Sequence, residues 1–157
     1  MQLDDALAYS RYARRLIGAN PALRDELDAT LDRAFDWGTA RAAIEAVAAA
    51  PGAADAVGPA LRSLRARVML HTIARDLTGR AALPEVCAAV TTLAEVAIDA
   101  AASAVRRDLV DRHGEPFGGE TGAPQPLVVV GMGKLGGAEL NVSSDIDLVF
   151  AYPEEGE

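Results

Sequence analysis

The chain has 157 residues, half of them apolar, and its 15 lysines and arginines face 23 aspartates and glutamates, for a net charge of −8. This length and apolar content suffice for one domain with a hydrophobic core. The acidic balance argues against nucleic acid as a general partner, because no basic surplus is available to neutralise phosphates.

The sequence carries few signs of secretion or of membrane insertion. Its one cysteine, Cys87, cannot form an internal disulfide. The N-terminus carries Asp4 and Asp5 where a signal peptide needs a basic stretch and then an apolar one. No uninterrupted apolar run reaches the roughly 18 residues of a membrane span. We therefore expect a cytoplasmic protein without a membrane partner.

Residues 1–113 predict an all-α region, because apolar residues recur at helical spacing and are punctuated by glycine, proline and capping residues. The first expected segment is amphipathic and runs from Leu3 to Ile17, and the second helix is capped by Asn20, has Pro21 in its first turn and carries an apolar face to Phe35. A third helix is expected over 40–50. A fourth is opened by Gly58 and Pro59 and closed by Gly79, and the longest runs from Pro84 to about His113.

The composition then changes. Residues 114–126 hold four glycines and three prolines and predict a loop. The valine-rich run at 127–131 predicts a buried strand, and the alternation at 145–152 predicts a second strand with Asp145 and Asp147 on one face. The expected fold class is α+β, in which a helical region, 1–113, precedes the start of a catalytic domain at 127–157.

Glycines surround the only lysine of the chain directly after the first expected strand. Gly131, Gly133 and Gly136 flank Lys134. A glycine-rich turn exposes backbone N–H groups at the start of a helix, where anions bind. We therefore expect this turn, with Lys134, to contact phosphate.

Two aspartates form the second half of the candidate site. Alternate residues of a strand project side by side, so Asp145 and Asp147 can hold divalent cations, for which we expect Mg²⁺. Ser143 and Ser144 add hydroxyl groups just ahead of them. The arrangement predicts phosphoryl or nucleotidyl transfer, in which the protein mainly positions charge.

Other motifs that bind phosphate or a divalent cation fit the spacing less well. The three glycines match the G-x-G-x-x-G pattern of a dinucleotide-binding domain, but only eight residues separate Gly136 from Asp145, too few for a crossover helix. A Walker A loop requires Ser or Thr where Leu135 stands. An EF-hand loop is excluded because Ile146 and Leu148 alternate with the acids.

The turn and the acid pair resemble the nucleotidyltransferase superfamily of the DNA polymerase β type. Its signature is an apolar residue, Gly, then Gly or Ser, followed at a short distance by two acids one residue apart. Here Val130-Gly131-Met132 precedes the acids by twelve residues, and Met132 departs from the usual small residue.

The longer string GMGKLGGAELNVSSDIDLVFAYPE resembles the bifunctional glutamine synthetase adenylyltransferase/adenylyl-removing family, and the helical segment at 61–79 is similar as well. LNVSSDIDLVFAYP is more similar to the N-terminal, adenylyl-removing copy of the catalytic domain. The resemblance implies that inorganic phosphate removes AMP from a tyrosine of glutamine synthetase as ADP. It also implies a PII signalling protein as a partner and ATP as a substrate elsewhere in the full-length enzyme.

The superfamily uses a third carboxylate from a later strand, and we expect that residue beyond Glu157. The chain is then the N-terminal piece of a larger enzyme, inactive alone. Three alternatives stay open at this stage: another nucleotidyltransferase, a dinucleotide-binding domain, or a non-catalytic helical docking module.

Overall fold

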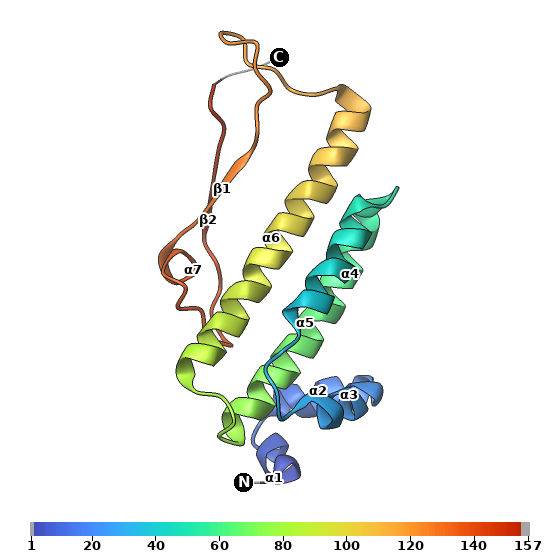
Figure 1. The fold of residues 1–157 in the computed structure, drawn as a ribbon, viewed down its shortest axis with the longest axis vertical. Coiled ribbons are helices and arrows are strands. Elements are labelled where there is room, and N and C mark those ends of the chain that lie inside the picture. Colours follow the sequence, from blue (N-terminus) through green and yellow to red (C-terminus); the bar gives the residue numbers. More distant parts are fainter. Residues whose placement is uncertain (1, 155–157) are drawn as a thin grey trace.

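The computed structural model describes residues 2–154, which form a helical body and a small antiparallel sheet (Figure 1). The α+β fold class is confirmed. In chain order the elements are α1 (Leu3–Ala8), α2 (Arg11–Ala19), α3 (Ala22–Thr30), α4 (Trp37–Ala49), α5 (Ala53–Leu77), α6 (Leu83–His113), β1 (Val128–Gly131), α7 (Gly133–Gly136) and β2 (Leu148–Ala151).

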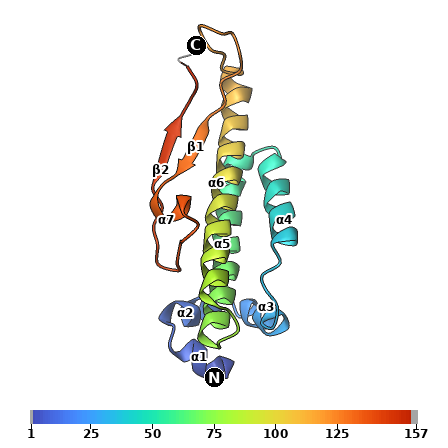
Figure 2. The ribbon, with the colours of Figure 1, turned by 60° about the vertical axis from the view of Figure 1, so that its left-hand side comes forward.

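Three helices make the main core. The long helices α5 and α6 run side by side, and α4 packs against both of them (Figures 1 and 2). Ile44 of α4, Leu64 and Val68 of α5 and Leu93 of α6 are buried in one apolar cluster. The apolar stripes predicted for these helices therefore face one another, and burial of those stripes stabilises the bundle.

The three short helices pack on the C-terminal half of α5. Leu7 of α1, Leu23 and Leu27 of α3 and Leu70 of α5 form a second buried cluster. The segment expected as one helix from Leu3 to Ile17 is two helices, because Ser10 ends the first and caps the second by accepting from the Ala13 N–H at 3.1 Å.

Arg75 of α5 joins the short helices to the turn before α6. Its side chain is 8% exposed and its Nε lies 2.7 Å from Glu85 Oε1. The same guanidinium donates to the backbone carbonyls of Leu31, at 2.7 Å, and Arg80, at 3.0 Å. Arg75 is therefore ion-paired and buried, unlike a solvated surface arginine.

Three helix boundaries were predicted wrongly. Helix α4 begins at Trp37 instead of residue 40, because Asp36 caps it by accepting from the Thr39 N–H at 3.1 Å. Helix α5 begins at Ala53, so Pro59 lies inside it, because Ala53 and Val57 are buried in the main core and hold this N-terminal extension in helical conformation. Helix α3 ends at Thr30, and Phe35 lies beyond it, where its ring packs against Trp37 at a centroid distance of 5.0 Å.

Helix α6 is long and apolar enough to meet the length and composition test for a membrane span, which we did not expect from the sequence. The test is also met by core helices, and α6 packs against α4 and α5. Of its most apolar 18-residue stretch, 33% is buried against the rest of the protein.

Strands β1 and β2 pair antiparallel, with Val128 opposite Ala151 and Gly131 opposite Leu148. The hairpin lies on the side of α6 opposite α4 (Figure 2). The second strand is shorter than predicted, since it begins at Leu148 and leaves Asp145 and Asp147 in the segment before it. The pairing nevertheless continues one step further, through a hydrogen bond of 2.9 Å from Met132 N–H to the Asp147 carbonyl.

Glu154 ties the end of β2 to the loop that precedes β1. Its carboxylate accepts from the backbone N–H groups of Glu120 and Thr121, from the Thr121 hydroxyl and from the Gln125 amide. Hydrogen bonding to Thr121 and these other donors lowers the pKa of Glu154. Two neighbouring acids, Glu155 and Glu157, lie outside the described residues.

Candidate functional site

The glycine turn is folded tightly against the end of β1. Gly133 has φ +52°, a left-handed conformation that favours glycine. A Cβ on Gly131 would lie 2.7 Å from Leu135 Cγ, and a Cβ on Gly136 would lie 2.6 Å from the Gly131 carbonyl oxygen. All three predicted glycines are therefore required by the turn itself, whether or not a ligand binds there.

The turn leaves polar groups free at its tip. Between residues 2 and 154, the N–H groups of Gly133 and Lys134 have no hydrogen-bond acceptor. The Lys134 side chain is exposed and makes no ion pair with any described acid. These donors are thus open to an anion, although α7 is only one turn long, and their contact with phosphate stays a prediction.

Two leucines anchor the site to the helical body. Leu135 of α7 is 8% exposed and Leu140 is 1% exposed, and both belong to the cluster that contains Leu93 and Val96 of α6. The glycine turn and the segment before the acids are therefore packed against the helical core as well as connected to the hairpin.

The segment between Leu140 and Asp145 is a hydrogen-bonded turn. The Asn141 side-chain oxygen accepts from the Ser143 N–H at 3.0 Å and from the Ser143 hydroxyl at 2.9 Å. Ser144 N–H donates to the Asn141 carbonyl, and Asn141 N–H donates to the Ser144 hydroxyl, each at 3.1 Å. Both serine hydroxyls thus make hydrogen bonds within the turn, whereas the sequence indicated only that they lie just ahead of the acids.

Asp145 and Asp147 project from the short stretch between this turn and β2. Both side chains are exposed, and neither makes a hydrogen bond or ion pair with another side chain within residues 2–154. Carboxylates without protein partners are free to bind a cation. No third His, Cys, Asp or Glu joins them in the described part of the chain to complete a metal-binding group.

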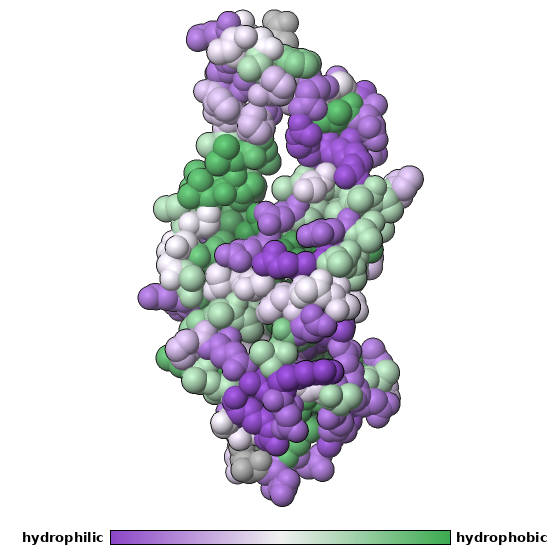
Figure 3. Space-filling model, viewed as in Figure 1, coloured by the Kyte–Doolittle hydropathy of each residue, from purple (hydrophilic) through white to green (hydrophobic). Residues whose placement is uncertain are grey.

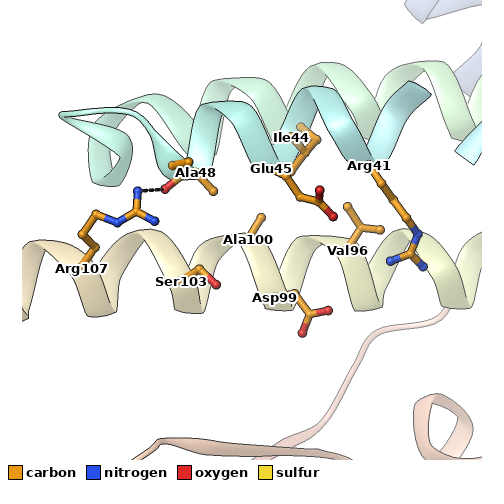
Figure 4. Close-up of a pocket in the computed structure, with 10 residues that line it drawn as sticks. Arg41, Ile44, Glu45, Ala48, Val96, Asp99, Ala100, Ser103 and Arg107 are labelled. Atoms are coloured by element: carbon orange, nitrogen blue, oxygen red, sulfur yellow. Dashed lines mark hydrogen bonds between the residues drawn. The ribbon is translucent and has the colours of Figure 1, made fainter. Parts of the chain in front are cut away.

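The pockets lie elsewhere. One of about 280 Å³ opens between α4 and α6, where Arg41, Glu45, Asp99 and Arg107 surround an apolar floor (Figure 4). Arg107 spans its rim and donates to the Ala48 carbonyl at 2.7 Å. None of the predicted site residues lines this pocket, so it does not form part of the candidate site.

A second, larger pocket of about 890 Å³ lies between the C-terminal half of α6 and the outer end of the hairpin. It is lined by apolar residues such as Val105 and Leu109, and neighbouring hairpin side chains are exposed, Phe150 by 61% and Tyr152 by 62%. Apolar surface accordingly gathers over the hairpin (Figure 3). The sequence predicted a buried strand at 127–131, and that expectation is wrong: Leu127, Val128 and Val130 are exposed, because no described segment covers their side of the two-stranded sheet.

The antiparallel pairing excludes one of the alternatives that the sequence left open, a dinucleotide-binding domain. A dinucleotide-binding turn joins two parallel strands through a crossover helix. Here the strands on either side of the glycine turn are antiparallel neighbours. The G-x-G-x-x-G match is therefore coincidental.

Comparison with known proteins places the chain in a family. The model of the glutamate-ammonia ligase adenylyltransferase family matches residues 1–157, and the chain belongs to that family. The resemblance found in the sequence is thereby confirmed.

Curated relatives carry one name, bifunctional glutamine synthetase adenylyltransferase/adenylyl-removing enzyme. The chain is 48% identical to that of Thioalkalivibrio sulfidiphilus over 152 residues, 46% to that of Ralstonia nicotianae over 156, and 44% to that of Chromobacterium violaceum over 149. These matches cover 96%, 97% and 95% of this chain, respectively, and 16% of each relative. The chain thus spans about one sixth of the length of these relatives.

Proposed function

We propose that this chain forms the helical support and the first part of the active site for removal of AMP from glutamine synthetase. In the proposed reaction, an oxygen of inorganic phosphate attacks the phosphorus of AMP linked to a tyrosine. The phosphorus–oxygen bond to tyrosine breaks, the tyrosine oxygen takes a proton, and ADP leaves. Adenylylated glutamine synthetase is then the protein substrate, and the reaction takes place in the cytoplasm.

The hydrogen bond between Met132 N–H and the Asp147 carbonyl is the observation that carries this proposal. It holds the glycine turn and the second aspartate next to each other, although fourteen residues lie between them in the sequence. The free N–H groups of Gly133 and Lys134 and the Lys134 ammonium suit an attacking phosphate, and the unpaired carboxylates suit a cation. These groups match two of the three carboxylates, and the glycine turn, that the resemblance to polymerase β-like nucleotidyltransferases implies.

Mg²⁺ is the proposed cofactor. Asp145 and Asp147 would hold it, because exposed carboxylates without protein partners are ligands that Mg²⁺ accepts. When bound, the cation neutralises phosphate oxygens as charge moves to the leaving group. A further carboxylate would come from the remainder of the longer protein. That protein would also carry the ATP-dependent attachment activity and the surface that a PII signalling protein contacts.

Substitution of the two aspartates in the full-length enzyme tests the proposal. Asp145→Asn and Asp147→Asn should each lower phosphate-dependent ADP release from adenylylated glutamine synthetase by about a hundredfold or more, the size expected for loss of a metal ligand. Asp111→Asn is the matched control, since Asp111 is an exposed aspartate on α6 without a side-chain partner among the described residues. Both site variants should still attach AMP from ATP.

Two results would contradict the proposal. Near-normal AMP removal in both site variants would exclude the acid pair from the reaction. Loss of AMP attachment with intact removal would assign this chain to the other activity of the enzyme.

A further inference from the structure

Asn141 is the centre of the turn that precedes the acid pair. Four hydrogen bonds, between 2.9 and 3.1 Å long, join it to Ser143 and Ser144. Its side-chain oxygen alone accepts two of them. The chain has one other asparagine, Asn20, which is exposed, ends α2 and makes no side-chain hydrogen bond among the described residues.

The turn stands between two fixed points. On one side, Leu140 is 1% exposed and packed into the core beneath α6. On the other, the Asp147 carbonyl is held by Met132 N–H at 2.9 Å. Only Asp145 and Ile146 lie between the turn and that hydrogen bond, so the turn and the hydrogen bond together hold the backbone from which both carboxylates project.

We propose that Asn141 is a positioning residue for the acid pair: its side-chain oxygen holds residues 141–144 in the conformation that presents Asp145 and Asp147 together to a divalent cation. The inference rests on the proposed function, and it gives Ser143 and Ser144 a role as members of this turn. A ligand held in its binding orientation before the cation arrives does not lose conformational freedom on binding.

The chemistry of residue 141 decides what can replace it. Alanine removes the acceptor for both Ser143 donors, so the turn loses its internal support. Aspartate keeps an oxygen at the same position and forms the same kind of turn. Asn141→Ala and Asn141→Asp therefore separate the role of the acceptor from the volume of the side chain.

The test compares these two variants in the full-length enzyme, with Asn20→Ala as the matched control. The readouts are the Mg²⁺ concentration for half-maximal ADP release, the thermal midpoint, and amide hydrogen exchange of the peptide over residues 140–148. For Asn141→Ala we expect about tenfold more Mg²⁺ to be needed, the effect of losing a residue that orients a metal ligand. Exchange in that peptide should be faster, and the thermal midpoint should equal that of Asn20→Ala. Asn141→Asp should stay within about threefold of the natural enzyme.

Three results would overturn the inference. The first is an unchanged Mg²⁺ requirement in Asn141→Ala, which would show that the turn does not orient the acids. The second is an Asn141→Asp enzyme whose Mg²⁺ requirement is raised as much as that of Asn141→Ala. Because aspartate keeps the acceptor oxygen, that result would show that the acceptor does not position the acids, and it would do so whether or not the alanine variant folds. The third is full activity in Asp145→Asn, which removes the proposed function itself. An inactive Asp145→Asn beside a normal Asn141→Ala overturns only the role of Asn141.

Discussion

Gly136 lies directly over the carbonyl oxygen of Gly131: a Cβ built on Gly136 would be 2.6 Å from that oxygen. The next glycine, Gly137, has room, since its nearest contact would be 3.5 Å away. A side chain would therefore collide with the backbone at Gly136 but not at Gly137. The turn between strand β1 and the acid pair requires glycine at the first of these two positions.

Gly136→Ala should consequently move the turn away from β1. We expect the free energy of unfolding to fall by about 1 to 3 kcal/mol, as for other insertions of an extra methyl group into a packed position. Gly137→Ala should change it by about 0.5 kcal/mol or less. Urea unfolding of both variants measures the difference, and equal stability would show that the turn relaxes without cost.

Lys134 is the only lysine of the chain and lies at the open tip of that turn. If it contacts the attacking phosphate, Lys134→Gln should raise the KM for phosphate in ADP release about tenfold, the effect of losing one hydrogen bond to a charged group. Lys134→Arg keeps the charge and should stay within about threefold. An unchanged KM in Lys134→Gln would identify Lys134 as a solvated surface residue.

Arg75 should contribute more to stability than the exposed arginines. Arg75→Met leaves Glu85 without its partner and two carbonyls without their donor, and we expect a loss of about 3 kcal/mol. That figure is the low end for a buried pair, because the Glu85 side chain remains 37% exposed. Arg112→Ala, which removes a surface pair with Asp108, should cost about 0.5 kcal/mol or less. Chemical denaturation at neutral pH compares the two.

The Arg75 pair also predicts a dependence on pH. The hydrogen bond from Arg75 lowers the pKa of Glu85 below its ordinary value of 4.5. Stability from this pair is present above pH 4.5 and is lost as the pH falls through the lowered pKa of the folded state. In Arg75→Met this part of the acid dependence should disappear, and its persistence would assign the acid sensitivity to other carboxylates.

His71 gives a second pH effect at a higher pH. Its side chain is 4% exposed, and burial lowers its pKa below the ordinary 6.5, although Nε2 lies 3.3 Å from the Thr30 carbonyl. Because the unfolded chain takes up a proton more readily, stability should fall as the pH drops from 6.5 through the lowered pKa. His71→Gln should flatten this slope. His113→Gln, at the other and exposed histidine, should leave it unchanged; if it does not, His71 is not the titrating group.

The sequence predicted those elements whose signals are local. Regular apolar spacing was sufficient for α4 and α6, and glycine with proline marked the loop before β1. The three glycines were recognised as a turn, and the whole motif was sufficient to identify the family. Local sequence signals predicted a helix boundary wrongly where tertiary packing outweighed the conformational preference of a residue. Pro59 was expected to begin a helix, but burial of Ala53 and Val57 extends α5 by nearly two turns before it.

Tertiary structure decided how the parts of the candidate site are held. No periodicity indicated that Leu135 and Leu140 would enter the core of α5 and α6, because both are isolated apolar residues in a polar, glycine-rich stretch. The hydrogen bonds from Ser143 to the Asn141 side chain, by contrast, span only two residues, so they are a local signal that the sequence-based prediction missed. The sequence alone thus predicted which residues form the candidate site. The contacts that hold those residues in place join segments far apart in sequence, so only the tertiary structure shows them.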